Sequence, residues 1–194
     1  MKRPMMLPPL MYITNHKLMG EGPEILDALR AAVWSLPPRS VLVHIRERDL
    51  EGRALTELCR AMLPIIRDAS QLVVVNDRLD VARYVGADGV HLPREGLPAR
   101  TARGLWPSAI IGRACHSADE LVAEADIDYV TLSPIFETPS KPGVVAQGLG
   151  SVARAAQAQT PFYALGGIDA SNAASVFAAG APGVAMMRAA WRRQ

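Results

Sequence analysis

The run Leu72-Val73-Val74-Val75, followed at once by Asn76-Asp77-Arg78, says most about the fold. Four apolar residues stand in a row, and no polar residue alternates with them. This pattern is typical of a strand that is covered on both faces in a parallel sheet. Polar side chains begin where the apolar run ends. We therefore predict a parallel sheet flanked by helices, with its chemistry at the carboxyl ends of the strands.

The same alternation of strand and helix continues on both sides of this run. Eight regular strand–helix units favour closure into a (β/α)8 TIM barrel over a doubly wound open sheet. Short apolar runs predict strands at 11–14, 41–45, 72–75, 89–92, 109–112, 128–132, 162–165 and 183–187. Apolar residues at helical spacing predict helices near 25–36, 55–66, 81–85, 99–105, 117–125, 150–158 and 171–179.

The size of the chain, 194 residues, suits one domain that spans residues 1–194. This is small for a barrel of eight units, so we expect short loops and a shortened last helix after residues 183–187. A barrel so compact would leave apolar surface exposed, and we expect it to bury that surface in a homodimer.

Composition excludes several classes of partner. A net charge of +2 without an arginine–lysine tract argues against nucleic acid. No apolar stretch approaches the roughly 20 residues that a membrane helix requires. Cys59 and Cys115 do not form a CxxC pair, which indicates a reducing cytoplasm and no structural zinc site.

The segment after the fifth predicted strand contains Cys115, His116, Ser117 and Glu120. The spacing of Ser117 and Glu120 predicts a capping box at the start of the helix 117–125. No activating base stands near Cys115 in the sequence, so we expect a buried structural thiol rather than a nucleophile.

The glycine pair Gly166-Gly167 follows the seventh predicted strand. Glycine lets backbone amides approach an anion closely, and the loops after strands seven and eight are the usual phosphate site of this fold. A tight turn is the alternative interpretation. At this position we favour phosphate binding.

Arginine, asparagine and aspartate side chains follow the second and third strands. Arg46 and Arg48 are candidates to bind a second anionic group such as a pyrophosphate, and the alternative is a salt-bridged pair around Glu47. Asn76 and Asp77 are candidate Mg²⁺ ligands, with an ordinary helix N-cap as the alternative.

A long loop rich in proline and glycine follows the sixth strand and contains Thr138, Ser140 and Lys141. We expect these three residues to bind the ligand from a lid over the barrel. A plain surface loop is the alternative.

Motifs along most of the chain resemble one family, which contains thiamine-phosphate synthase and its relative TenI, a thiazole tautomerase. The matching segments are 44–48, 76–82, 86–93, 111–113, 128–130, 134–138, 164–168 and 180–185. In combination and order they are specific for the family, whereas each one alone is a weak signal.

The resemblance implies ligands and site residues. Synthases of this family join a hydroxymethylpyrimidine pyrophosphate to a thiazole phosphate and release pyrophosphate. It implies that Arg46, Asn76 and Asp77 bind pyrophosphate and Mg²⁺. It also implies that the thiazole phosphate is held by Gly166, Gly167 and the backbone near Met187.

The sequence departs from the synthase pattern where pyrophosphate and metal would bind. Arg48 stands in place of a lysine, Ala114 and Arg188 in place of serines, and Gly96 in place of the second Mg²⁺ aspartate. Unless Glu95 substitutes for it, the loss of a carboxylate should weaken Mg²⁺ binding. Because stabilising the departing pyrophosphate is the main electrostatic task of that reaction, these losses argue against synthase activity.

Other segments look more like TenI. They are Arg-Glu-Arg at 46–48, Leu-Pro at 92–93, Ile-Gly-Arg at 111–113 and Phe-Glu-Thr at 136–138. The tautomerase pattern has a catalytic histidine where Pro134 stands here. A proton shift needs a positioned acid–base group, so His91 becomes the candidate catalytic residue. We expect His116 to be structural or exposed to solvent.

Three hypotheses follow. The first is a TenI-like protein of thiamin metabolism that binds thiazole phosphate or thiamin phosphate, with tautomerase activity left open. The second is a divergent Mg²⁺-dependent thiamine-phosphate synthase, a transferase. The third is a non-catalytic binding or regulatory protein. Each implies a small phosphorylated thiazole or pyrimidine ligand and no organic cofactor.

Overall fold

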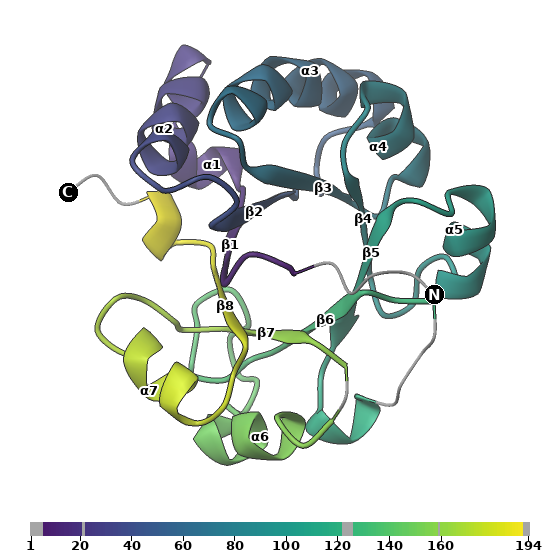
Figure 1. Ribbon diagram of the computed structural model, residues 1–194. Coiled ribbons are helices and arrows are strands. Elements are labelled where there is room, and N and C mark those ends of the chain that lie inside the picture. Colours follow the sequence, from purple (N-terminus) through teal and green to yellow (C-terminus); the bar gives the residue numbers. More distant parts are fainter. Residues whose placement is uncertain (1–5, 21, 122–125, 159, 192–194) are drawn as a thin grey trace.

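Eight parallel strands close into a barrel (Figure 1). The structure is a computed structural model and describes residues 6–20, 22–121, 126–158 and 160–191. Each strand pairs in parallel with the next, and β8 pairs with β1. The strands are β1 (Leu10–Ile13), β2 (Val41–Ile45), β3 (Leu72–Asn76), β4 (Gly89–Leu92), β5 (Ile110–Cys115), β6 (Tyr129–Leu132), β7 (Phe162–Leu165) and β8 (Gly183–Met186). The predicted barrel is confirmed.

Helices surround the barrel (Figure 1). They are α1 (His16–Met19), α2 (Pro23–Trp34), α3 (Gly52–Asp68), α4 (Leu79–Val85), α5 (Ala99–Leu105), α6 (Gly148–Ala155) and α7 (Ala173–Ala178), with short 3₁₀ turns η1 (Ala118–Glu120) and η2 (Ala189–Trp191). After β8 the described chain forms only η2, as the predicted shortened last helix requires. No apolar pattern in the sequence predicts α1. This single turn begins where the Asn15 side chain accepts the amide N–H of Lys17.

The segment after β5 differs from the prediction. Strand β5 runs on to Cys115, so the chain turns later than expected, and the helix predicted at 117–125 is only the turn η1 where it is described. Residues 122–125 of that prediction lie outside the described residues. The capping box is wrong, because Ser117 makes no capping bond and the Glu120 carboxylate accepts the amide N–H of His116 instead, at 3.1 Å.

Side chains fill the barrel interior at the amino ends of the strands. Tyr129 and Tyr163 pack edge to face, and the Tyr163 hydroxyl donates to the carbonyl of Pro8, which precedes β1. A Cβ atom on Gly112 would stand 2.1 Å from Cζ of Tyr129. Glycine is therefore required on β5 to make room for the buried tyrosine ring. Above this apolar layer, towards the carboxyl ends of the strands, the interior becomes polar.

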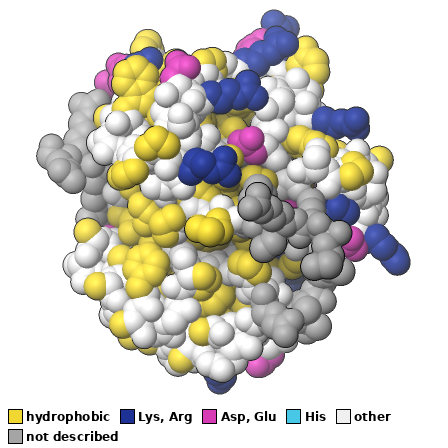
Figure 2. Space-filling view, viewed as in Figure 1, with side chains coloured by type: hydrophobic (Ala, Val, Ile, Leu, Met, Phe, Trp, Pro, Cys, Tyr) yellow, Lys and Arg dark blue, Asp and Glu magenta, His cyan; other side chains and the backbone are white. Residues whose placement is uncertain are grey.

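The outer surface is uneven in character. On the face seen in Figure 2, hydrophobic side chains gather on the side of α6, α7 and β8, whereas lysine and arginine side chains lie mainly over α3, α4 and α5. Phe177 on α7 is among the large hydrophobic residues that remain exposed. The homodimer stays a prediction. No helix in the described ranges has the length and apolar character needed to cross a membrane.

Candidate functional site

The closed barrel gathers the predicted site residues at one rim. Residues that follow parallel strands must lie at the carboxyl ends of those strands, which form one face of a barrel. This rim receives Arg46 and Arg48 after β2, Asn76 and Asp77 at the end of β3, the loop with Thr138, Ser140 and Lys141 after β6, Gly166 and Gly167 after β7, and Met187 after β8. His91 lies just below it, on β4.

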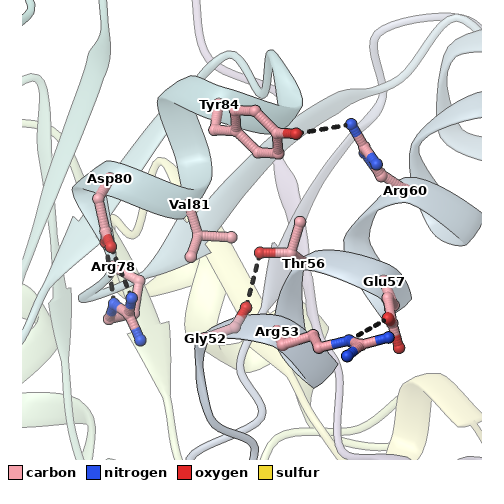
Figure 3. A pocket seen from close by; sticks show the side chains of 9 residues that line it. All are labelled: Gly52, Arg53, Thr56, Glu57, Arg60, Arg78, Asp80, Val81 and Tyr84. Carbon is pink, nitrogen blue, oxygen red and sulfur yellow. Dashed lines mark hydrogen bonds and ion pairs between the residues drawn. The ribbon is translucent and has the colours of Figure 1, made fainter.

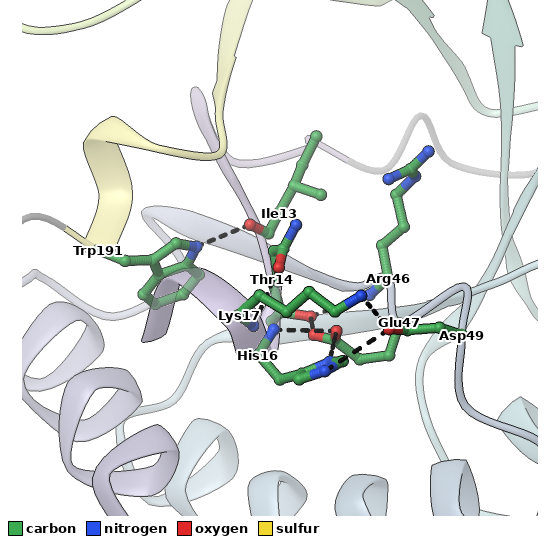
Figure 4. A network of polar contacts seen from close by, with 9 residues as sticks. Ile13, Thr14, His16, Lys17, Arg46, Glu47, Asp49 and Trp191 are labelled. Atoms are coloured by element: carbon green, nitrogen blue, oxygen red, sulfur yellow. Dashed lines mark hydrogen bonds and ion pairs between the residues drawn. The ribbon is translucent and has the colours of Figure 1, made fainter. Parts of the chain in front are cut away.

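Glu47 is turned away from its two arginine neighbours. Its buried carboxylate accepts hydrogen bonds from the hydroxyl of Thr14 and from the backbone amide of His16, and it lies 2.8 Å from Nδ1 of the His16 ring (Figure 4). No ion pair joins it to Arg46 or Arg48 in the structure as described. The alternative of a salt-bridged pair around Glu47 is therefore wrong, and both guanidinium groups are available to a ligand.

Arg46 extends from the rim in the direction opposite to Glu47 (Figure 4). Burial lowers the pKa of its guanidinium, as does the charge of Arg48, while Glu47 opposes the shift. An arginine remains charged throughout the ordinary pH range. A half-buried cation without a paired carboxylate is a strong binding point for an anion. Arg48 is exposed and borders the neighbouring cavity.

His16, Glu47 and Asp49 form a cluster whose ligand atoms lie within 4.8 Å of one another. That spacing would allow a metal ion. However, Lys17 places its ammonium 2.6 Å from the Asp49 carboxylate, and Glu47 already binds His16. The existing contacts neutralise the cluster, and we assign no metal to it.

His91 points into the barrel, beneath the rim, and only 3% of its surface is exposed. Its Nδ1 lies 3.1 Å from the Tyr129 hydroxyl, and its ring centroid lies 4.5 Å from that of His44 on β2. Burial, aided by the charge of Arg46, lowers the pKa of His91 to about 3. Burial lowers the pKa of His44 as well, followed by the effects of His91 and Arg46. Both rings are therefore neutral at neutral pH.

A cluster that the sequence did not reveal lies at the mouth of the barrel. Nζ of Lys141 donates to the hydroxyl of Ser133 at 3.0 Å and lies 3.3 Å from Nδ1 of His116. We expected His116 to be structural or solvent-exposed, and its ring is exposed but in contact with a predicted binding residue. The two residues are 25 positions apart, in the loops after β5 and β6. Only the order of strands around the closed barrel brings them together.

The loop of residues 133–148 folds back on its own start. The amides of Gln147 and Gly148 donate to the carbonyls of Pro134 and Ile135, and Lys141 donates its amide to Thr138. These bonds hold the loop at the rim and direct Lys141 inward. That it acts as a lid over a ligand remains a prediction.

The predicted Mg²⁺ site has one carboxylate. Asp77 does not cap α4, whose N-cap is Arg78, so the N-cap alternative is wrong. A Cβ atom on Gly96 would lie 3.3 Å from Oδ1 of Asp77 and 2.6 Å from the Pro93 ring. The position of the missing aspartate therefore faces Asp77. Glu95 does not substitute for it, because its side chain is 91% exposed and directed at Arg94.

A cavity of about 470 Å³ opens beside this half of the rim, and Arg48, Asn76 and Asp77 are among its lining residues. Its lining carries both signs of charge, from Arg48 and Arg78 and from the carboxylates of Glu47, Glu51 and Asp77. It is large enough to admit a small anionic group with bound water.

For the glycine pair after β7, a tight turn and a phosphate site were alternative interpretations, and the two are compatible. Gly166 and Gly167 have φ angles of 106° and 65°, which side chains rarely tolerate. A Cβ on Gly166 would also stand 2.8 Å from Cα of Pro134. The tight turn is real. It nevertheless leaves the amides of residues 166–168, and of 187 and 188 in the adjacent loop, without an acceptor in the described part of the chain.

A second cavity, of about 420 Å³, lies outside the barrel between α3 and α4 (Figure 3). Its charged side chains are already paired. Arg60 donates to the Tyr84 hydroxyl at 3.0 Å, Arg53 binds Glu57 at 2.9 Å, and Arg78 binds Asp80. The rim of the barrel is the better candidate site, because cations and amides there have no partner within the described ranges.

Comparison with known proteins identifies the family. A family model described as thiamine monophosphate synthase (TMP-TENI) matches residues 10–190. The chain belongs to this family. The predicted resemblance is confirmed.

Relatives of the chain carry the synthase name. A thiamine-phosphate synthase of Moorella thermoacetica is 38% identical over 186 residues, which cover 92% of this chain and 86% of that protein. A thiamine-phosphate synthase of Nostoc is 41% identical over 152 residues, 76% of this chain, but the match spans only 43% of that longer protein. The solved thiamine phosphate pyrophosphorylase of Pyrococcus furiosus superposes with a TM-score of 0.77 at 28% identity, over 92% of this chain and 84% of that one.

Proposed function

We propose that this protein binds thiazole phosphate or thiamin phosphate at the carboxyl rim of the barrel, as a TenI-like member of its family. The observation that carries the proposal is the asymmetry of the rim. Among the described residues, one side has amides without an acceptor at Gly166, Gly167 and Met187, whereas the other has the single carboxylate of Asp77, facing Gly96. The first side suits a phosphate group. The second lacks the paired carboxylates of a strong Mg²⁺ site.

The side chains around the mouth would orient the rest of the ligand. Arg46, after β2, is the cation that attracts an anionic substituent, and the Lys141 amine reaches the same mouth of the barrel from the loop after β6. Thr138 and Ser140 belong to the same loop as Lys141 and would contact the ligand with it. His91 would act from below as a neutral imidazole, which can donate one hydrogen bond and accept another. Because its pKa of about 3 keeps it unprotonated, His91 would serve a proton shift as a base or as an N–H donor.

The residues present do not fit a two-carboxylate Mg²⁺ site. Asn76 and Asp77 offer one amide oxygen and one carboxylate. Thiamine-phosphate synthase activity is the second candidate function, because the named relatives share up to 41% identity and Arg46, Asn76 and Asp77 are retained. We also propose a homodimer in the cytoplasm.

Three assays separate the hypotheses. A rise in melting temperature with thiamin phosphate, but not with unphosphorylated thiamin, is expected. Mg²⁺-dependent release of pyrophosphate from the two synthase substrates would establish the synthase instead. Tautomerisation of a thiazole carboxylate phosphate, abolished by His91→Ala in a variant that still binds thiamin phosphate, would establish the tautomerase. Binding without either reaction would leave a non-catalytic binding protein.

If no thiamin-related phosphate changed the melting temperature, the proposed ligand class would be wrong. Size-exclusion chromatography tests the dimer separately. A monomer at micromolar concentration would contradict it.

A further inference from the structure

Lys141 is unusual in a chain that uses arginine for nearly all of its cations. Of 21 basic residues only three are lysines, at positions 2, 17 and 141. Lys2 lies outside the described residues, and Lys17 is exposed and bound to Asp49. Lys141 is thus the one primary amine that the described side chains place at the mouth of the barrel. An amine can lose its proton and act as a nucleophile, whereas a guanidinium cannot.

The surroundings of the Lys141 amine favour reaction at nitrogen. It forms no ion pair with a carboxylate in the ranges that the structure describes. Instead it contacts the Ser133 hydroxyl and the His116 ring, at 3.0 Å and 3.3 Å. Burial and the charge of Arg46 lower its pKa, which raises the share of neutral amine. A desolvated lysine beside a second cation is a known way to activate an amine.

We propose that Lys141 forms a Schiff base with the carbonyl group of a small phosphorylated aldehyde or ketone. The selection for a phosphate group rests on the phosphate site of the proposed function. The two features adjoin, because Ser133 directly precedes Pro134, whose Cα packs against Gly166. A short ligand can therefore place its phosphate at the amides of 166–168 and its carbonyl at Nζ of Lys141.

The step balances without an oxidant or reductant. The lone pair of Nζ attacks the carbonyl carbon, a carbon–nitrogen bond forms, the carbon–oxygen double bond becomes single, and one proton moves from the nitrogen to the oxygen to give a neutral carbinolamine. His116, whose Nδ1 lies 3.3 Å from Nζ, then passes a proton to the hydroxyl group, water leaves, and the carbon–nitrogen double bond forms. Ser133 holds the amine through the approach. His116 regains its proton from the iminium nitrogen or from water.

Borohydride trapping tests the proposal directly. The protein is incubated with glyceraldehyde 3-phosphate, reduced with borohydride, and mapped by peptide mass spectrometry. We expect one adduct per chain, on Lys141, that saturates with ligand and is absent from Lys141→Arg. Lys17→Arg is the matched control and should label as the wild type does. Unfolding midpoints of both variants report whether they fold.

Two further experiments test the phosphate site and the role of His116 separately. Unphosphorylated glyceraldehyde should label Lys141 at least about tenfold less, because charge-assisted bonds to the phosphate are absent. Equal labelling by both aldehydes would overturn the proposed phosphate site and with it the selection for phosphorylated ligands. His116→Gln should slow adduct formation about a hundredfold, because the side chain that passes the proton is lost. Label on Lys17 or the N-terminus alone would overturn the role of Lys141.

Discussion

The buried pair His44 and His91 should make the stability of the barrel depend on pH. Their ring centroids are 4.5 Å apart, and burial lowers both pKa values, that of His91 to about 3. In the unfolded chain both return to about 6.5. As the pH falls below that value, the unfolded chain takes up protons that the folded chain does not. The free energy of unfolding should therefore fall from about pH 6.5 downwards.

The size of the effect follows from the same values. While the folded rings stay neutral, lowering the pH from about 7.5 to 5.5 costs about 1.4 kcal/mol for each histidine. The pair together contributes about 2.8 kcal/mol, a large share of the 5–15 kcal/mol typical of a domain. Stability lost in this way should return fully when the pH is raised.

Urea unfolding at several pH values measures this dependence. The wild type is compared with a His44→Gln, His91→Gln double variant, in which His16 and His116 are unchanged and so cancel. We expect the wild type to lose about 2.8 kcal/mol more than the variant over these two pH units. If the free energy of unfolding changed with pH equally in the two proteins, the reasoning would be refuted. An NMR titration of native His91 near its ordinary pKa would refute it as well.

Three other substitutions test particular contacts. Gly112→Ala places a Cβ 2.1 Å from Cζ of Tyr129 and should lower the free energy of unfolding by about 1–3 kcal/mol or more, as measured by urea unfolding; unchanged stability would contradict the packing described for β5. Gly96→Asp faces a carboxylate towards Asp77 and should raise Mn²⁺ affinity about tenfold in calorimetric titration, whereas equal affinity would show that the two positions share no metal site. Glu47→Gln removes a buried charge bound by Thr14 and His16 and should cost about 1–3 kcal/mol at pH 7, and a loss below about 0.5 kcal/mol would count against this network.

The barrel could be predicted from the sequence because its signals are local. Each strand is a short apolar run, as at residues 72–75, and each is followed by polar residues that the topology must bring to one rim. The positions of Arg46, Asp77 and Gly166 at that rim follow from strand order alone. Side-chain detail was not needed for them.

The remaining features depend on geometry that the sequence does not carry. The alternative interpretation paired Glu47 with the arginines beside it, but neighbouring residues of an extended chain point to opposite sides, and Glu47 contacts Thr14 and His16 instead. The contact between His116 and Lys141 exists only because β5 and β6 are adjacent in the closed sheet. Of the helix predicted at 117–125, the described residues form only the turn η1 (Ala118–Glu120), and the sequence also did not show that β5 continues to Cys115.

Cys115, by contrast, has the buried environment that the sequence predicted. Cys115 was expected to be a structural thiol, since no base stands near it in the sequence. It is buried and unpaired by disulfide, and burial raises its pKa to about 11. A thiol with that pKa is protonated at neutral pH and is a poor nucleophile. The expected burial of this thiol is confirmed.

A crystal structure of the protein with thiamin phosphate tests the central claim most directly. We expect the phosphate oxygens within hydrogen-bond distance of the backbone amides of Gly167, Ile168 and Arg188, with the rest of the ligand turned towards Arg46 and Lys141. A phosphate bound away from the loops after β7 and β8, or an empty rim at saturating ligand, would contradict it.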